Sequence, residues 1–417
     1  MTASSDNLEH FGDDDQGAAD SEIVQPTAAA VRLFHSITLR NLLSFSSENE
    51  PLELKNLNVL IGPNGSGKSN LLETIRLLRA ATSDLRPVLS QGGGVGEWIW
   101  KGQFDATATI EVVVDNPGGT QPLRHLFSFR SEHEVFHIQD ERIENEQPDA
   151  GQNEPVSYYR FSDGRPIVIR AGEIRTFNLA RFNLDLSILA QLNDPDVYPE
   201  IGYLGNIFRK IRLYRDWAIG RDSLIRRPQK TGLQNHPLKE DFSNLGLFLN
   251  RLRRKPKGKQ ALLSQLRDLY EGLNDFDFNI EGGAVQVYFT EGDFSIPATR
   301  LSDGSLRYLC LLAILCDPTP PPLIGIEEPE LGLHPDLLPK VADLLVEASK
   351  RCQLIVTTHS DILVDALSEQ PESIVVCEKH DGQTSMRRLD STELAPWLEK
   401  YRLGQLWTSG ELGGTRW

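Results

Sequence analysis

The chain has 417 residues, of which 39% are hydrophobic and 24% charged, and 43 Lys and Arg against 59 Asp and Glu give it a net charge of −16. This composition excludes a fibrous or wholly disordered chain, and the length suits one large domain with insertions or two to three smaller ones. The longest apolar run, residues 308–316, is well short of the about 18 residues that a membrane span needs, so we expect no membrane association.

The first thirty residues differ in composition from the rest. Residues 1–30 contain seven acids and no Lys or Arg among Gly, Ala and Ser, which predicts a disordered acidic tail without the basic and apolar blocks of a signal peptide. The cysteines have no C-x-x-C spacing and lie in apolar runs, which favours reduced core residues over metal ligands. Both features predict a cytoplasmic location. The cysteines are Cys310, Cys316, Cys352 and Cys377.

Residues 57–78, LNVLIGPNGSGKSNLLETIRLL, read as a buried strand, a glycine-rich loop and an amphipathic helix. The loop fits G-x-x-x-x-G-K-[ST] in the structural context that this motif requires; the alternative is a glycine-rich turn that matches by coincidence. Glycines let backbone N–H groups curl around phosphate oxygens, and the helix N-terminus adds its positive end. Lys68 would reach the β- and γ-phosphates of ATP, and the Ser69 hydroxyl would ligate Mg²⁺. The expected nucleotide-binding residues are Gly62, Asn64, Gly65, Ser66, Gly67, Lys68, Ser69 and Asn70.

The middle of the chain combines strand patterns with a basic helical region. Alternating apolar residues at 106–115, 124–130 and 165–170 predict strands of a β-lobe, and amphipathic pieces from about 180 to 275 predict a mostly helical arm. Residues 205–260 hold fifteen Lys and Arg against four acids. Such a surface could bind nucleic-acid phosphates, although basic runs are more often simply solvated.

Three motifs follow in the last third of the chain. Ser302 and Gly304 precede a strongly apolar helix, Glu327 and Glu328 end an apolar strand, and His359 ends another. Ligands of an open α/β sheet lie at the carboxyl ends of its strands, so the loop after residue 61, the two glutamates and the histidine are expected to share one crevice. The alternatives are a helix cap at Ser302, a strand-end role for one glutamate, and a histidine without a function in ligand binding.

Taken in this order, the motifs resemble those of the ABC-type ATPases, within them the SMC, RecF and OLD lineage. LSDGS resembles the signature sequence, LIGIEE the Walker B strand, ELGLHP the D-loop and TTHS the switch histidine. The resemblance implies an α/β P-loop NTPase fold with an ABC-type head, a β-lobe and an inserted helical arm. It also implies that Glu327 holds Mg²⁺, that Glu328 is the general base and that His359 contacts the γ-phosphate. Glu327 stands where the family usually has Asp, which leaves the division of roles between the two glutamates open.

The resemblance further implies that Ser302 and Gly304 contact ATP bound to a second copy, and that Glu330 lies in a loop facing that copy. We therefore expect a homodimer or a higher even-numbered homo-oligomer. The expected organisation is an acidic tail (1–30), an N-terminal ATPase lobe with the β-lobe (31–175), a basic insertion (176–275) and a C-terminal ATPase lobe (276–417).

The expected function is ATP hydrolysis coupled to nucleic-acid sensing or to control of a separately encoded effector protein, in phage defence or DNA maintenance. The alternative is a nucleotide-stabilised scaffold or sensor with little turnover. Only 58 residues follow His359, fewer than the about 100 that a nuclease domain of the OLD type needs, so no intrinsic nuclease is expected. Weaker candidates are Gln91 or Gln103 as a Q-loop glutamine, Arg40 and Asn41 as nucleotide contacts, and Trp397, Trp407 and Trp417 as a closing flap, a subunit contact or, more commonly for such residues, core packing.

Overall fold

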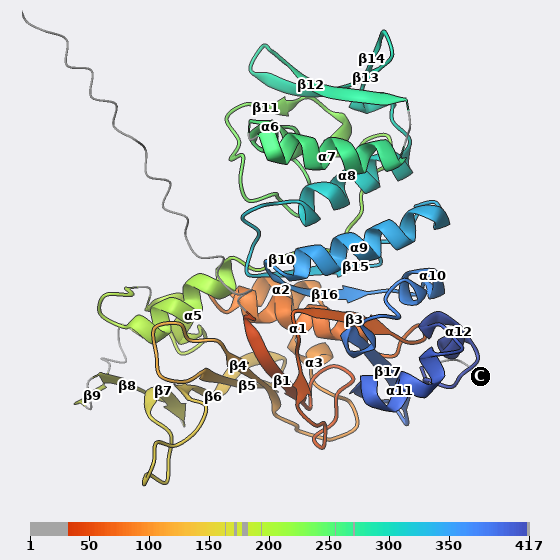
Figure 1. Cartoon of the computed structure of the whole chain (residues 1–417). Helices are drawn as coiled ribbons and strands as arrows, with labels where there is room; N and C mark the ends of the chain where they lie inside the picture. The colour runs from red at the N-terminus through yellow and green to blue at the C-terminus, as the bar shows by residue number, and fades with distance from the viewer. Residues whose placement is uncertain are drawn as a thin grey trace, which may run out of the picture.

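A computed structural model describes residues 32–414, except 163, 171–172, 177–181, 193, 255 and 270–271. The acidic tail predicted at 1–30 and Trp417 lie outside the described residues. Within the described part of the chain, no helix combines the length and the apolar character needed to cross a bilayer. Three β-sheets and the helices packed against them make up the structure (Figure 1).

A six-stranded sheet lies at the centre, and its first five strands run parallel while the last is antiparallel. The apolar runs LNVLI, LIGIE and QLIVT supply its middle strands, which are buried on both faces, as parallel strands usually are. The predicted strand, loop and helix at 57–78 are present, since the loop leads from β3 into α1 (Lys68–Ala80). In spatial order the strands are β10 (Arg212–Tyr214), β15 (Leu323–Glu327), β16 (Gln353–Thr357), β3 (Leu57–Ile61), β17 (Ile374–His380) and β18 (Gln383–Arg388).

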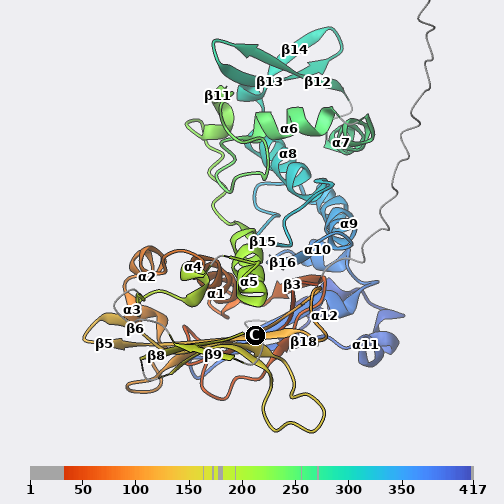
Figure 2. The same ribbon diagram turned by 90° about the vertical axis from the view of Figure 1, so that its left-hand side faces the viewer.

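An eight-stranded antiparallel sheet forms the β-lobe below the central sheet (Figures 1 and 2). The strands predicted at 106–115, 124–130 and 165–170 are β4, β5 and β8. The apolar face of α1, including Leu71, Ile75 and Leu78, packs in the same core as this sheet. In spatial order the strands are β2 (Leu52–Glu53), β1 (Phe34–Arg40), β4 (Ala108–Val114), β5 (Leu123–Glu132), β6 (Val135–Asn145), β7 (Ser157–Ser162), β8 (Arg165–Arg170) and β9 (Glu173–Thr176).

Helices α6, α7 and α8 pack with a small antiparallel sheet in the upper part of Figure 1. Their apolar residues, among them Phe248, Leu266 and Leu309, share one core with β15 and β16. This core attaches these helices and the small sheet, together called the helical body, to one face of the central sheet. The elements are α6 (Leu245–Arg253), α7 (Pro256–Leu269), α8 (Asp303–Leu315), β11 (Gln229–Lys230), β12 (Leu273–Glu281), β13 (Ala284–Glu291) and β14 (Phe294–Pro297).

Segment 176–275, predicted as a mostly helical insertion, contributes to more than one part of the molecule. Its helices α4 to α7 are present, but β10 belongs to the central sheet and β11 to the small sheet. A strand of three residues within a basic sequence gives no periodic pattern, which is why β10 escaped prediction. The remaining elements are α2 (Arg86–Gln91), α3 (Val95–Trp98), α4 (Ile188–Gln191), α5 (Pro199–Arg209), α9 (Leu338–Ser349), α10 (Asp361–Asp365), α11 (Ser391–Leu398), α12 (Leu403–Thr408) and the 3₁₀ turns η2 (Leu224–Arg226), η3 (Ala298–Arg300), η4 (Pro335–Leu337) and η5 (Pro371–Ser373).

Candidate nucleotide site

The loop after β3 has the backbone shape of a phosphate-binding loop. Gly62, Gly65 and Gly67 have φ angles of +146°, +80° and +98°, a region that side chains rarely adopt. A Cβ at residue 62 would lie 2.2 Å from the carbonyl oxygen of Cys377. The loop therefore depends on glycine at its base, while Asn64 and Gly65 form its exposed crest.

Lys68 begins α1 and folds back over the loop. Its Nζ donates hydrogen bonds to the carbonyl oxygens of Gly62 (2.8 Å) and Pro63 (3.0 Å). Burial lowers the pKa of Lys68, and nearby carboxylates, Glu328 among them, partly oppose this effect. The ammonium thus lies at the centre of the curled loop, where a phosphate oxygen could replace the two carbonyl oxygens as its partner.

A buried hydrogen-bond cluster supports the loop from behind. The Thr384 hydroxyl, on β18, lies 2.6 Å from the Ser44 hydroxyl and 3.0 Å from the carbonyl oxygen of Ser66. Asn70 Nδ2 donates to the same Ser44 hydroxyl at 2.7 Å. A Cβ at Gly67 would lie 2.3 Å from Thr384 Oγ1. The sequence pattern gave no sign of this support, because Ser44 and Thr384 are 340 residues apart.

Glu327, the last residue of β15, lies at the start of α1. The Ser69 hydroxyl donates to its Oε1, and Arg215 Nε donates to its Oε2 at 2.7 Å. A serine hydroxyl and a carboxylate in contact are oxygen ligands of the kind that Mg²⁺ takes. These two predicted metal ligands therefore lie together and fit the ion.

Glu328 and His359 face each other across the ends of β15 and β16. Glu328 has a left-handed backbone, with φ of +47°, and its N–H donates to the carbonyl oxygen of Thr357 at 3.0 Å. Its Oε1 lies 3.4 Å from His359 Nε2. Non-glycine residues rarely adopt such a backbone, and strained conformations of this kind cluster at functional sites.

Glu330 turns inward in this chain. Its Oε1 accepts the backbone N–H of His359 at 2.7 Å, and burial raises the pKa of its carboxyl group. Its Oε2 is buried with no hydrogen-bond partner among the described residues. The Glu330 carboxylate thus holds the backbone of the histidine loop within its own chain; that its loop faces a second copy stays a prediction.

The turn at Ser302 caps α8. The Ser302 hydroxyl accepts the N–H of Ser305 at 3.1 Å, and Arg226 donates to the carbonyl oxygens of Thr299 (3.0 Å) and Leu301 (2.7 Å). A Cβ at Gly304 would lie 2.8 Å from the carbonyl oxygen of Gly332. The glycine therefore lets α8 approach the loop after β15 closely. In the described chain, the hydrogen bonds of the Ser302 hydroxyl stay within its own turn, to residue 305.

The two glutamines considered for a Q-loop lie elsewhere. Gln91 accepts a hydrogen bond from Arg76 beside a cavity on the outer side of α1, and Gln103 is exposed in a turn. Instead, Arg215 follows β10, the edge strand that pairs with β15, and its side chain contacts Glu327. Sequence reasoning missed it because β10 was not recognised.

The other weak candidates make contacts within the chain. Asn41 Nδ2 donates to the carbonyl oxygen of Thr107 at 3.3 Å, and Arg40 lies 4.0 Å from Glu111. Trp407 is buried, and its indole N–H donates to the carbonyl oxygen of Gly414 at 3.2 Å. Trp397 remains 46% exposed. Trp407 is therefore a core residue, whereas Trp397 is not.

Much of the basic run at 205–260 is paired inside the chain. Arg251 lies 3.6 Å from Asp317, Lys259 pairs with Asp275 at 2.8 Å, and Arg253 pairs with Asp277. These pairs reduce the positive charge that the run presents to solvent.

The four cysteines are free thiols, and all but the half-buried Cys316 are buried. Burial raises the pKa of Cys316 to about 11 and that of Cys352 to about 12. Cys310, Cys352 and Cys377 are core residues with free thiols, as predicted, and Cys316 lies at the edge of the core.

The parallel sheet, the curled loop and the two glutamates at the end of β15 define a P-loop ATPase head. Residues 57–365 match the family described as "AAA domain, putative AbiEii toxin, Type IV TA system", and the protein belongs to this family. A protein named "OLD nuclease" from Thermus scotoductus is 25% identical over an alignment of 378 residues, which covers 86% of this chain and 65% of that protein. The chain thus spans 65% of the length of that relative.

Two solved structures share the fold. An Smc head bound to the C-terminal winged-helix domain of ScpA superposes with a TM-score of 0.51 at 15% identity, covering 87% of this chain and 99% of the other. An Smc head with an extended coiled coil, bound to the C-terminal domain of ScpA and derived from Pyrococcus furiosus, also superposes with a TM-score of 0.51. Its sequence identity is 15%, and the superposition covers 88% of this chain and 99% of the other. The prediction of an ABC-type ATPase head of the SMC, RecF and OLD lineage is confirmed. Families of this kind use ATP and Mg²⁺.

Proposed function

We propose that this protein hydrolyses ATP between two heads, each of which binds one nucleotide in its own loop and completes the site of the other. The observation that carries the proposal is the pairing of Glu328 with His359 beside the Ser69 and Glu327 contact, next to the curled loop. A carboxylate, a histidine, a hydroxyl and a lysine at one strand edge are the groups that phosphoryl transfer to water requires.

Each residue has a distinct proposed role. Lys68 and the loop N–H groups hold the phosphates, and Ser69 with Glu327 holds Mg²⁺, which supplies charge neutralisation when it is bound. Glu328 accepts the proton of the attacking water. His359, whose ring lies 3.4 Å from Glu328, orients that carboxylate and donates to the γ-phosphate. Gly62, Asn64, Gly65, Ser66, Gly67 and Asn70 complete the cradle.

We propose that Ser302 and Gly304 act on the nucleotide of the second copy. Ser302 caps the N-terminus of α8. The free backbone N–H groups of a first helical turn favour an anionic partner. Asp303 in that turn is paired with Arg226, which limits its repulsion of phosphate. A homodimer or larger even-numbered assembly would place this turn opposite the loop of its partner.

The test combines light-scattering mass and phosphate release on the wild type, Glu328→Gln and Lys68→Ala, each with and without ATP and Mg²⁺. We expect the wild type to release phosphate, and Glu328→Gln to double its mass with ATP while release falls by at least about 100-fold, the usual contribution of a general base. Lys68→Ala should do neither. An unchanged mass together with unchanged phosphate release in Glu328→Gln would refute the proposal.

The same measurements separate the alternative function, a nucleotide-stabilised scaffold or sensor. ATP-dependent doubling of the mass in a wild type that releases almost no phosphate would support that alternative. We propose a separately encoded effector protein as the partner in either case, and phage defence or DNA maintenance as the setting. The likeness to a protein named OLD nuclease and to an Smc head bound to ScpA supports these proposals.

A further inference from the structure

Arg215 is a cation placed directly against the expected metal ligand. The register of β10 with β15 pairs Tyr214 with Ile326, so the next residues, Arg215 and Glu327, lie side by side at the carboxyl ends of the two strands. Arg215 Nε donates to Glu327 Oε2 at 2.7 Å, and their side chains are 20% and 18% exposed. The pair is therefore shielded from water, which strengthens its attraction relative to a surface pair.

Both oxygens of Glu327 are already engaged in this chain. Oε1 accepts from Ser69 and Oε2 from Arg215, while Trp217 holds the backbone by donating its indole N–H to the Glu327 carbonyl oxygen at 2.7 Å. Lys68, the other nearby cation, donates instead to Gly62 and Pro63. Arg215 is thus the cation that already pairs with the carboxylate that a metal ion would need.

We propose that Arg215 is a resident counter-cation for Glu327, which keeps divalent metal out of the head until the phosphates of a nucleotide add their own charge. This inference rests on the proposed nucleotide site. A guanidinium neutralises the carboxylate and repels a second cation, so Glu327 with Ser69 attracts Mg²⁺ weakly on its own. With ATP in the loop, phosphate oxygens supply further anionic ligands and outweigh that repulsion.

The guanidinium has a second anionic partner. Arg215 also pairs with Glu73, on the outward side of α1. Burial opposes its charge, but the hydrogen bonds to Glu327 and Glu73 raise its pKa. Arg215 can therefore release Glu327 to a metal without becoming an unpaired buried charge.

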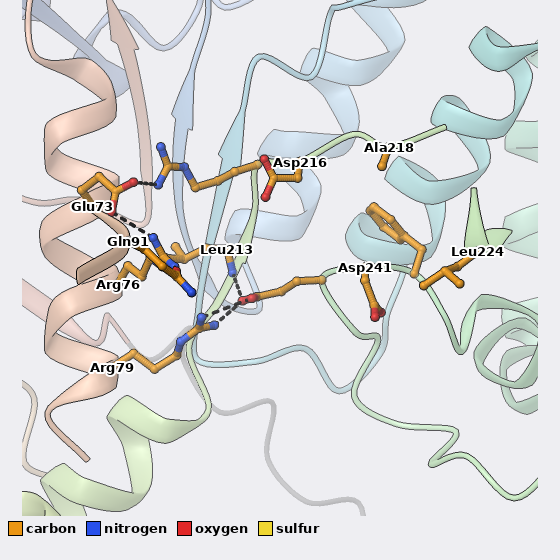
Figure 3. A pocket seen from close by; sticks show the side chains of 12 residues that line it. Glu73, Arg76, Arg79, Gln91, Leu213, Asp216, Ala218, Leu224 and Asp241 are labelled. Carbon is orange, nitrogen blue, oxygen red and sulfur yellow. Dashed lines mark hydrogen bonds and ion pairs between the residues drawn. The ribbon is translucent and has the colours of Figure 1, made fainter. Parts of the chain in front are cut away.

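Space for this movement lies next to the pair. A cavity of about 550 Å³ is lined by Arg215, Glu73, Arg76 and Asp216. Figure 3 shows it between α1, from which Glu73, Arg76 and Arg79 project, and the segment that carries Leu213 and Asp216. The side chain can turn toward this cavity without displacing the apolar core.

Binding of Mn²⁺ to the full nucleotide-free chain, followed by the EPR signal of free Mn²⁺, tests the proposal. Mn²⁺ serves as the probe because it takes the same oxygen ligands as Mg²⁺. Arg215→Gln removes the charge and keeps a hydrogen-bond donor. Two controls accompany it. Arg215→Lys keeps the charge, and Arg76→Gln removes a charge from the same cavity at a residue that contacts Glu73 and Gln91. Far-UV circular dichroism and melting curves confirm that each variant is folded.

We expect Arg215→Gln to bind Mn²⁺ at least about tenfold more tightly than the wild type, equivalent to about 1.4 kcal/mol. Arg215→Lys and Arg76→Gln should stay within about threefold of the wild type, less than about 0.7 kcal/mol. With ATP present, the difference between wild type and Arg215→Gln should shrink. Equal or weaker Mn²⁺ binding by Arg215→Gln without nucleotide would overturn the inference. A separate titration with a fluorescent ATP analogue in EDTA tests nucleotide binding itself, so failure of the proposed function would show there first.

Discussion

Replacing Arg226 should loosen the turn that begins α8. The Arg226 side chain is only 10% exposed and pairs with Asp303. It also donates to the carbonyl oxygens of Ile219 (3.2 Å), Thr299 (3.0 Å) and Leu301 (2.7 Å). One guanidinium thus joins the segment after β10 to the residues immediately before the Ser302 cap.

The expected cost follows from these contacts. A hydrogen bond from a charged donor contributes about 1.5–3 kcal/mol, but water can replace part of what the carbonyl oxygens lose. Asp303 is 71% exposed, so its ion pair adds less than about 1 kcal/mol. We expect Arg226→Ala to lower the free energy of unfolding by about 2–4 kcal/mol in urea. In a Glu328→Gln background it should also reduce the ATP-dependent gain in mass.

Arg227→Ala is the matched control, because Arg227 is 61% exposed and its partner Asp222, 3.9 Å away, is fully exposed. This variant should unfold at the wild-type urea concentration and dimerise normally. If Arg226→Ala and Arg227→Ala behave alike in both assays, the turn does not depend on Arg226 and the reasoning is wrong.

Three further predictions concern the loop and the thiols. Gly67→Ala places a methyl group against Thr384 at a φ of +98° and should abolish binding of a fluorescent ATP analogue; retained binding would show that the loop tolerates a Cβ. Thr384→Val removes the hydroxyl that contacts Ser44 and should weaken ATP binding about fivefold or more, a loss of about 1 kcal/mol. Thr384→Ser keeps the hydroxyl and should bind ATP as tightly as the wild type. Equal ATP affinities of Thr384→Val and Thr384→Ser would exclude a role for the hydroxyl. A raised pKa of about 11 leaves the Cys316 thiol almost wholly protonated at pH 8, so Ellman's reagent should react with it slowly in the native protein. The rate should rise as the pH approaches 11, and the thiol should react fully in urea. A fast reaction of Cys316 in the native protein at pH 8 would contradict its burial.

Sequence patterns predicted the elements that have a strong local signal. The strand, loop and helix at 57–78 have apolar runs on both sides of a motif that needs glycine, and the structure places them as expected. The acidic end of β15 and the histidine after β16 also lie at the same sheet edge, because parallel strands bring their carboxyl ends together. These predictions succeeded since each depended on neighbouring residues or on one topological rule.

The missed residues depend on contacts between distant segments. Arg215 acts on Glu327 only because a three-residue strand pairs with β15, and Thr384 supports the loop only because β18 folds back beside β17. The contact of the Glu330 carboxylate with the N–H of His359 was not predicted either, because it joins the loop after β15 to the loop after β16. None of these pairings has a periodic or spacing signature in the sequence.

The basic run now has a different meaning from the one its composition suggested. Arg215 pairs with Glu327, and Arg226 pairs with Asp303 at the turn that begins α8. Arg251 and Arg253 pair with Asp317 and Asp277. Positive charge that is already neutralised inside the chain releases few counterions when nucleic acid binds. Nucleic-acid binding would therefore have to use cations that remain exposed. Exposed cations of this segment include Lys210, Arg221, Lys230, Lys239 and Arg254. Replacing these with Gln should weaken any salt-dependent affinity for DNA, whereas the same change at Arg251 and Arg253 should chiefly lower the stability of the fold.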